Sequence, residues 1–295
     1  MVRAGDVDEA AQWETATVMD HTRSSAFLQC PERYQLAYVE GLKKVEETGD
    51  DAPLRYGSAL HAGLDAYYLP AGISPSQAFL KVFPAQLSPD DLVRTPATGI
   101  TVLTEYVNRW GKLDKQWKVL AVEKLVTCDI GAEEPWEVKY DLIVEGETGI
   151  YGIEHKHTAR REGFNDTYWR SFEPNSQVTG QVAGLLATYG QCSGVFINGI
   201  SIGFNKKAGS RRPAGFWVEF ERQLFNRSQR QVDDWKIRMG RTIKRMRSTV
   251  DWEKNESACT YCQFRELCLS AGDEQVRDTL YQRVANPLAY LEEMR

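Results

Sequence analysis

The stretch Ile153-Glu154-His155-Lys156-His157-Thr158 places a carboxylate and an amine two positions apart, at the end of a strand-like segment, 149–156. Side chains two positions apart on a strand point to the same face of a sheet, so Glu154 and Lys156 are predicted to project together. The preceding strand-like segment, 137–145, contains Asp141, and the turn Gly146-Glu147-Thr148-Gly149 joins both segments into a predicted hairpin. Asp141 can therefore lie beside Glu154 and Lys156.

Two carboxylates and a lysine that converge on one sheet face are costly unless something is bound to them. A divalent cation such as Mg²⁺ or Mn²⁺ takes carboxylate oxygens, acidifies a bound water and neutralises an attacked phosphate, while a lysine orients the water and stabilises developing charge. The alternative is a surface salt bridge between Glu154 and Lys156. His61, on a predicted early helix, is an acceptable Mn²⁺ ligand, although a lone histidine also occurs as an ordinary core residue.

The segments around the hairpin alternate between helical and strand-like patterns. Three helical patterns come first, then three strand-like segments that include the hairpin, and then a helix, two strands and a long basic helix. This order predicts one α/β core with a helical layer in front of it. The helices are expected at 23–39, 57–68, 92–110, 177–190 and 228–246, and the strands at 119–130, 137–145, 149–156, 195–204 and 216–220.

Three of the six cysteines are clustered in Cys259-Thr-Tyr-Cys262-Gln-Phe-Arg-Glu-Leu-Cys268. A pair of cysteines separated by two residues is a chelating unit for zinc or for an iron–sulfur cluster, and spacing alone leaves both open, with no metal as a third reading. Cys30, in a Cys-Pro turn, is the best candidate for a fourth ligand. The two other cysteines are expected to be core thiols: Cys128 and Cys192.

The composition, with 42% hydrophobic residues, is that of a folded protein, and no apolar run approaches the length of a membrane helix. The N-terminus has no signal-peptide core, so we expect a cytoplasmic protein without a membrane partner. The net charge of −5 argues against a general nucleic-acid coat protein. Two basic stretches are either solvated faces or part of a DNA path: Lys206, Lys207, Arg211 and Arg212, and Lys236, Arg238, Arg241, Lys244, Arg245 and Arg247.

Taken together and in this order, these residues resemble the PD-(D/E)XK nuclease superfamily, and within it the RecB-like branch that carries an iron–sulfur cluster. That branch includes AddB-type nuclease domains, CRISPR-adaptation nucleases and phage exonucleases, and the resemblance spans about residues 22–269. The matching elements are the opening Ser24–Pro31 with its Cys-Pro, the Gly-x-x-x-His pattern of Gly57–His61, Tyr140-Asp141 in place of the "PD" pair, the Glu-x-Lys strand at Glu154–Lys156, Gln177, and the C-terminal cysteine triplet.

The resemblance implies a restriction-endonuclease-like α/β fold, a central mixed sheet flanked by helices, with an N-terminal helical layer and a C-terminal iron–sulfur subdomain. The expected parts are a loosely ordered 1–20, a nuclease core at 21–250 with a helical insertion around 70–115, and a cysteine-rich 251–295 joined to Cys30. It also implies roles for single residues. His61, Asp141, Glu154 and the His155 carbonyl would bind Mg²⁺ or Mn²⁺, Lys156 would be the catalytic lysine, Glu123 and Gln177 would support them, and Cys30, Cys259, Cys262 and Cys268 would ligate a [4Fe–4S] cluster.

Two positions depart from the pattern. Gln181 stands where the helix motif Gln-x-x-x-Tyr has tyrosine, which puts the DNA contact of that helix in doubt. The proline before Asp141 is also missing, which matters less because proline coordinates nothing.

The expected function is a metal-dependent DNA nuclease, an exonuclease or end-processing enzyme on single-stranded DNA in recombination, repair or CRISPR adaptation. The chain has no P-loop motif, so a helicase, recombinase or CRISPR integrase partner would supply any unwinding or joining. A non-cleaving DNA-binding or assembly subunit is the alternative, and a redox protein is a third reading. The basic residues expected to contact DNA are Lys206, Lys207, Arg211, Arg212, Arg238, Arg241 and Arg245.

Overall fold

The computed structural model describes residues 19–45, 52–69, 72–86, 88–159, 163–207, 212 and 214–284. The chain forms two compact units, each built from segments that are not consecutive. The first unit combines Met1–Val45, Leu125–Val138 and Gln229–Arg295, and the second combines Glu46–Lys124 and Lys139–Ser228. The predicted core at 21–250 therefore contributes to both units, and most of the expected loosely ordered segment 1–20 lies outside the described residues.

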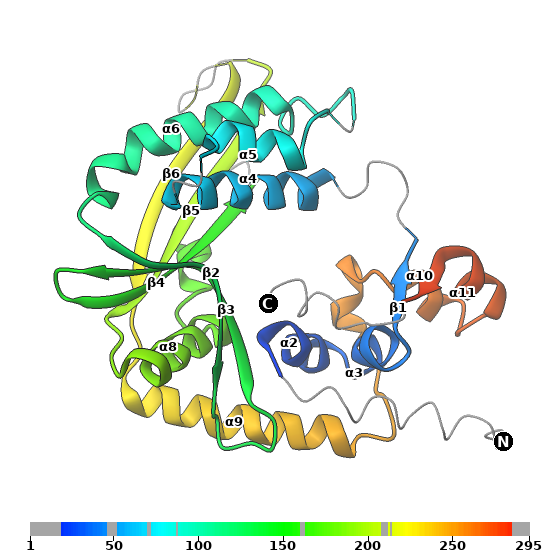
Figure 1. The fold of residues 1–295 in the computed structure, drawn as a ribbon. Helices are drawn as coiled ribbons and strands as arrows, with labels where there is room; N and C mark the ends of the chain where they lie inside the picture. Colours follow the sequence, from blue (N-terminus) through cyan, green and yellow to red (C-terminus); the bar gives the residue numbers. More distant parts are fainter. Residues whose placement is uncertain are drawn as a thin grey trace. The chain divides into compact units, whose positions relative to one another are not determined.

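A five-stranded sheet with the order β2-β3-β4-β5-β6 forms the framework of the second unit (Figure 1). The pair β3–β4 is antiparallel, β4–β5 is parallel and β5–β6 is antiparallel, so the sheet is mixed. The predicted central mixed sheet is thus confirmed, as is the hairpin, whose register runs from Leu142↔Ile153 to Gly146↔Gly149. The strands are β2 (Lys118–Cys128), β3 (Trp136–Gly146), β4 (Gly149–Thr158), β5 (Gly194–Asn205) and β6 (Gly215–Phe225).

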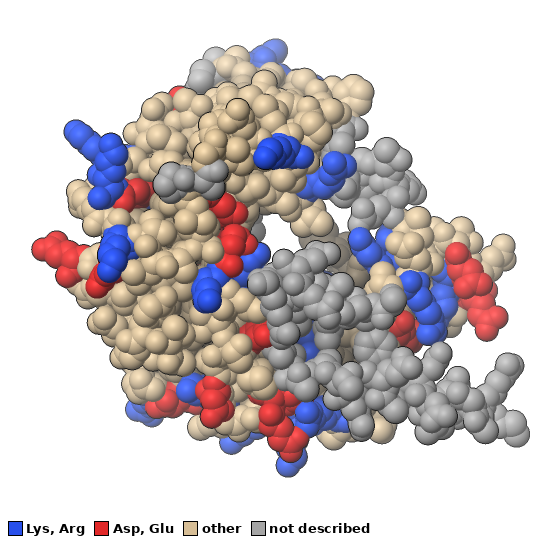
Figure 2. Space-filling view, in the orientation of Figure 1, with Lys and Arg blue, Asp and Glu red and all other residues tan. Residues whose placement is uncertain are grey.

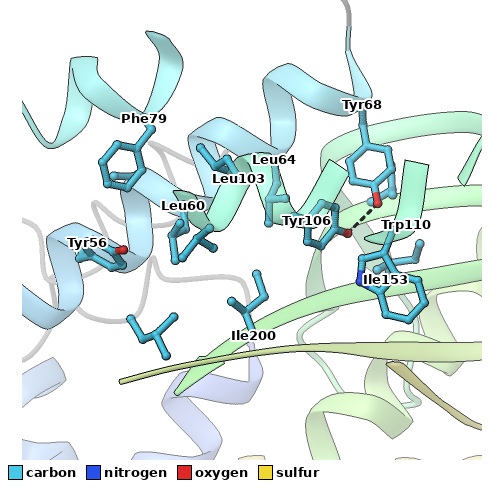
Figure 3. Packing of buried hydrophobic residues seen from close by; sticks show 14 of the residues in the cluster. Tyr56, Leu60, Leu64, Tyr68, Phe79, Leu103, Tyr106, Trp110, Ile153 and Ile200 are labelled. Carbon is cyan, nitrogen blue, oxygen red and sulfur yellow. Dashed lines mark hydrogen bonds between the residues drawn. The ribbon is translucent and has the colours of Figure 1, made fainter. Parts of the chain in front are cut away.

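Three helices of the second unit, α4 (Ala52–Tyr68), α5 (Pro75–Val82) and α6 (Pro96–Asp114), pack on one face of this sheet. Apolar side chains recur every four residues along α4, at Tyr56, Leu60, Leu64 and Tyr68, and this spacing lines up one buried face. Figure 3 shows this face meeting α5, α6 and the strands. Burial of each such leucine stabilises the unit by about 1.5–3 kcal/mol.

The starts of α5 and α6 are fixed by their own sequence. Ser74 and Thr95 each cap a helix by accepting a bond from the third helical amide, and a proline follows each cap. Helix α5 lies within the helical insertion expected around 70–115, but no separate helix was predicted at its residues, because the Pro- and Gly-rich residues around it resemble a loop. The expected helix at 92–110 begins later, at Pro96, for the same capping reason.

Helix α8 (Ser176–Tyr189) covers the opposite face of the sheet from α4, preceded by the short α7 (Asp166–Arg170) (Figure 1). The side chains of β4 alternate accordingly. Ile153 joins the core under α4, whereas a Cβ on Gly152 would meet Leu185 of α8. Helix α8 ends at Gly190, which adopts the left-handed conformation with φ +70° that favours glycine.

The first unit brings the early helices together with the C-terminal segments. The predicted helix at 23–39 is split at Cys30, which is extended, because Pro31 cannot continue the preceding helix and disfavours helical backbone before it. Strands β1 (Leu42–Lys44) and β7 (Tyr281–Arg283) pair antiparallel. The remaining elements are α2 (His21–Gln29), α3 (Pro31–Tyr34), the π-helix η2 (Gln35–Val39), α9 (Gln229–Ser248), the 3-10 helix η3 (Glu256–Tyr261), α10 (Arg265–Leu269) and α11 (Glu274–Leu280).

A small apolar core fixes these distant segments to one another. Leu36 and Leu42 from the early part of the chain pack with Phe264, Leu267 and Tyr281 from its late part. Among the helices in the described part of the chain, none has the length and apolar character needed to cross a membrane.

Candidate active site

Three side chains from three elements of the second unit form a compact group of potential metal ligands. His61 on α4, Glu123 on β2 and Asp141 on β3 each offer one ligand atom, and these atoms lie within 4.8 Å of one another. No other group of three His, Cys, Asp or Glu side chains in the described ranges meets this spacing. The group lines a pocket of about 420 Å³ that is also bordered by Asp65, Lys139 and His157.

Asp141 sits at the end of the β3–β4 ladder, one residue before Leu142, whose partner is Ile153. Its Oδ2 accepts a hydrogen bond of 2.7 Å from the amide of His155, and its Oδ1 lies 3.5 Å from Nδ1 of His61. One carboxylate oxygen therefore fixes the strand backbone while the other faces the pocket.

Glycine at position 57 allows α4 to approach β4. A Cβ on Gly57 would lie 2.3 Å from Cε1 of His157, so any larger residue would displace that ring. This close contact gives a physical reason for the glycine of the Gly-x-x-x-His pattern, because α4 carries His61 one turn later.

Glu123 adopts a left-handed backbone conformation, with φ +50°, in the middle of β2. Such a conformation is uncommon for a residue with a side chain and costs energy, and it persists where the surroundings enforce it. Here the carboxylate points into the pocket and pairs with Lys139. The strain therefore accompanies the placement of a potential ligand.

The pocket is strongly polarised. Burial lowers the pKa of His61, but the neighbouring Asp141 raises it more, to about 9. Burial raises the pKa of Asp141, but His61 and the His155 amide lower it well below its usual range. Burial and the charge of Glu123 raise the pKa of Asp65 to about 7. Without a cation, a proton on His61 balances the carboxylates, and a divalent cation would take that role and release the proton.

Glu154 and Lys156 lie on the sheet face that α8 covers, and they contact each other as their spacing predicts. Lys156 Nζ donates to Glu154 Oε1 at 2.6 Å, and the carboxylate raises the pKa of Lys156 against the lowering effect of burial. Gln177 of α8 contacts both residues. Glu154 is not part of the compact group of His61, Glu123 and Asp141.

His155, between Glu154 and Lys156, points to the other sheet face and is buried beneath α4 and α6. Burial lowers its pKa to about 3, so the ring is neutral, and its Nδ1 lies 2.7 Å from the side-chain amide of Asn198. A buried network continues from Asn198 to Tyr106, Arg222 and Asp114.

Comparison with protein families matches residues 20–269 to the PD-(D/E)XK nuclease superfamily. The chain belongs to this superfamily. Among solved structures, a "putative exonuclease" from Eubacterium rectale has 14% sequence identity and a TM-score of 0.51, and the match covers 92% of this chain and 100% of that one. A structure named SSO0001 has 12% identity and a TM-score of 0.35, with 90% and 93% covered. A search of curated proteins found no match.

In this PD-(D/E)XK chain, the structure brings most of the predicted metal ligands together but leaves the Glu154 side chain outside their compact group. His61 and Asp141 meet, Glu123 joins them, and Gln177 supports Glu154 and Lys156. Sequence reasoning missed Asp65, although its position four residues after His61 on one helix face was a usable signal. It also missed the contact of Gln181 with Glu154, which no sequence pattern announces.

The four cysteines predicted to bind one metal group line a single pocket of about 390 Å³ in the first unit. No three of their sulfurs lie within 4.8 Å of one another. Arg33, Lys254 and Arg265 border the same pocket. The two cysteines expected to be core thiols are placed elsewhere. Cys128 is buried and Cys192 half-buried, and burial raises the pKa of each to about 11.

The basic residues expected to contact DNA are distributed over both units. Lys206 and Lys207 are exposed after the end of β5, and Arg211 lies outside the described residues. Arg212 is engaged within the protein, because it pairs with Glu219 and stacks 3.5 Å above the ring of Trp217.

The other expected contacts lie on α9, in the first unit. Arg238, Arg241 and Arg245 recur at three- and four-residue steps on its exposed side, and Arg238 pairs with Asp234 at 2.8 Å. Figure 2 shows lysine and arginine side chains interspersed with acidic ones on the face that it presents.

Proposed function

We propose that this PD-(D/E)XK chain is a divalent-metal-dependent deoxyribonuclease that hydrolyses phosphodiester bonds. The observation that carries the proposal is the compact group of His61, Glu123 and Asp141 in a chain that also holds Glu154 and Lys156 in contact. Carboxylate oxygens suit Mg²⁺, and the imidazole makes Mn²⁺ an equally suitable ion. The donor set therefore fits such a cation.

His61, Glu123 and Asp141 would hold the cation, and we propose Glu154 and the main-chain carbonyl of His155 as further ligands. A bound divalent cation would acidify a water molecule and neutralise charge on the phosphate. Asp141 would bind the cation and also accept the hydrogen bond from the His155 amide, which fixes the backbone of β4 beside the cation.

Lys156 would orient the attacking water and stabilise the charge that develops on the phosphate. It is held for this role by Glu154 and by Gln177, whose Oε1 lies 3.2 Å from Nζ. Since Glu154 raises the pKa of Lys156, the amine is protonated before substrate arrives and acts first as a hydrogen-bond donor.

We further propose that the substrate is single-stranded DNA or a DNA end, cut in recombination, repair or CRISPR adaptation beside a helicase, recombinase or integrase. The description of a solved structure of similar fold as an exonuclease agrees with this proposal. Lys206 and Lys207 and the exposed arginines of α9 are the candidate phosphate contacts, because they are not buried.

For the cysteines, we propose one [4Fe–4S] cluster bound by Cys30, Cys259, Cys262 and Cys268, as in the RecB-like branch. All four line one pocket. Its border holds three basic residues and one acidic residue, Glu256, and this excess of positive charge suits the negative charge of a thiolate-bound cluster. A tetrahedral zinc site with Zn–S bonds of about 2.3 Å would set its sulfurs about 3.8 Å apart. No three of these four sulfurs lie within 4.8 Å of one another, so they are not arranged as a closed zinc site.

The decisive experiment is a cleavage assay on end-labelled single- and double-stranded DNA with Mg²⁺, with Mn²⁺ and with EDTA. We expect cleavage only with a divalent cation, and none from Asp141→Ala, Glu154→Ala or Lys156→Ala. Lys118→Ala is a matched control, since Lys118 is 73% exposed and pairs with Glu145 at the surface. Full activity of Lys156→Ala would contradict the proposed role, and DNA binding without cleavage by the wild type would identify a non-cleaving subunit.

A further inference from the structure

Gln181 holds the carboxylate of Glu154 from the interior of the second unit. Its side chain is fully buried, with 0% exposure, and its Nε2 donates to Glu154 Oε2 at 2.5 Å. Gln181 lies one helical turn after Gln177, so both glutamines project from the same side of α8 toward β4. The residue that departs from the helix motif thus contacts the proposed catalytic machinery directly.

The position of Gln181 is fixed at its backbone as well as at its side chain. The hydroxyl of Tyr140 on β3 donates to the main-chain carbonyl of Gln181. Tyr140 directly precedes Asp141, so this bond ties α8 to the strand that carries the proposed metal ligand. Gln181 therefore links the two strands on which Asp141 and Glu154 stand.

The side-chain carbonyl of Gln181 is buried without a hydrogen-bond partner among the described residues. An unsatisfied buried acceptor costs about 1–3 kcal/mol. Turning the amide over would place that oxygen against Glu154 Oε2, oxygen to oxygen, which is worse. The contact with Glu154 Oε2 thus determines the amide orientation, and the fold accepts an orphaned oxygen to keep a donor on Glu154.

The two oxygens of Glu154 are used unequally. Oε1 accepts from Lys156 Nζ at 2.6 Å and from Gln177 Nε2 at 2.9 Å, which occupies both of its lone pairs. Among the described residues, Oε2 accepts a hydrogen bond from Gln181 alone, so it keeps one lone pair for another partner. Oε2 is therefore the oxygen that can bind a cation while the carboxylate stays hydrogen-bonded.

We propose that Gln181 is a positioning residue that orients Glu154 so that Oε2 presents its remaining lone pair to the divalent cation. This inference rests on the proposed function. Hydrogen-bond partners of metal-binding carboxylates orient the ligand, and their loss costs 10- to 100-fold in metal affinity. Gln181 thus takes a role in metal binding in place of the DNA contact expected for tyrosine at this position.

The test is Mn²⁺ binding to the DNA-free full chain, measured by calorimetry, for wild type and Gln181→Met. Methionine approximates the shape of glutamine and removes both the donor and the orphaned oxygen. We expect the Mn²⁺ dissociation constant to rise about 10- to 100-fold. The unfolding midpoint should change little, because the lost hydrogen bond to Glu154 and the removal of the orphaned oxygen have opposite effects on stability. Activity should recover at saturating Mn²⁺, which separates weaker metal binding from a lost catalytic group.

Val182→Ala is the matched control, because Val182 is the neighbouring buried residue of α8 and lies outside the glutamine contacts. It should lower stability and leave Mn²⁺ affinity unchanged. If Gln181→Met does not fold, Gln181→Leu tests the same loss of the donor. Unchanged or tighter Mn²⁺ binding by the folded variant would overturn the inference.

A further variant separates this inference from the proposed function. His61→Ala removes a proposed ligand and should abolish Mn²⁺ binding. If wild type and His61→Ala bind Mn²⁺ equally or not at all, the proposed metal site is wrong. If His61→Ala loses binding and Gln181→Met keeps it, only the role of Gln181 is wrong.

Discussion

Asp114→Asn should strongly destabilise the second unit, because it leaves the buried charge of Arg222 without a counter-charge. The two side chains are 3% and 5% exposed, and Arg222 Nη1 lies 2.8 Å from Asp114 Oδ1. Burial lowers the pKa of Arg222, but the interactions with Tyr106 and Asp114 raise it more, so the net pKa lies above its usual range. The guanidinium therefore stays charged in the folded state. Asparagine keeps the shape and one of the two acceptor oxygens, which serve Arg222 and Tyr68, but it removes the charge.

The expected loss in free energy of unfolding is about 3–5 kcal/mol, the usual cost of breaking a buried ion pair at one partner. This is a large part of a typical total of about 5–15 kcal/mol. At about 2–4 °C per kcal/mol for a protein of this size, Tm should fall by roughly 6–20 °C.

Urea unfolding followed by tryptophan fluorescence is the appropriate assay, because two tryptophan rings report on the surroundings of Arg222. Its Cζ lies 4.2 Å from the ring centroid of Trp110 and 4.7 Å from that of Trp117. Glu145→Gln provides the control, since its pair with Lys118 is exposed and such pairs contribute about 0–1 kcal/mol. A loss below about 1 kcal/mol for Asp114→Asn would refute the reasoning. The double replacement Asp114→Leu with Arg222→Met should recover much of the stability, because it removes both charges together.

Three further predictions concern other parts of the molecule. Gly99→Ala should lower the free energy of unfolding in urea by about 1–3 kcal/mol, since its Cβ would lie 2.0 Å from Cζ of the buried Phe79. Gly111→Ala on the same helix is the control and should not lower it, so equal effects of the two variants would contradict this packing. Cys30→Ser should remove the absorbance near 400 nm and lower the Tm of anaerobically purified protein, and a colourless wild type with stoichiometric zinc would exclude the cluster. Charge reversal of Arg241 and Arg245 should flatten the salt dependence of DNA binding measured by fluorescence anisotropy, and an unchanged slope would show that α9 lies off the DNA path.

The hairpin and the central sheet could be predicted because strand periodicity is a local property of the sequence. The short helix α5 could not, since its capping box lies among residues typical of loops. The break at Cys30 was signalled by Pro31, although the helical spacing of apolar residues concealed it.

The candidate site shows the same division between local and tertiary information. His61 and Asp141 could each be predicted from a motif of a few residues, and the structure places Nδ1 of His61 3.5 Å from Oδ1 of Asp141. The partners of Glu154 on α8 depend on how a helix packs on a strand, so only the structure reveals Gln181. Arg212 looked like a phosphate contact because its neighbours are basic, but Glu219, seven positions later, satisfies its charge within the protein.

The pairing of β1 with β7 has a consequence for synthesis on the ribosome. Lys43 pairs with Gln282, so the first strand must wait for more than two hundred residues before its partner is made. At about 5–20 residues per second this delay is roughly 10–50 s. Residues 46–228 contain the whole second unit, interrupted only by Leu125–Val138 of the first unit, so the second unit can fold during the delay. Until Phe264 and Leu267 are made, Leu36 and Leu42 lack all of their late partners, and a nascent-chain chaperone would find them accessible.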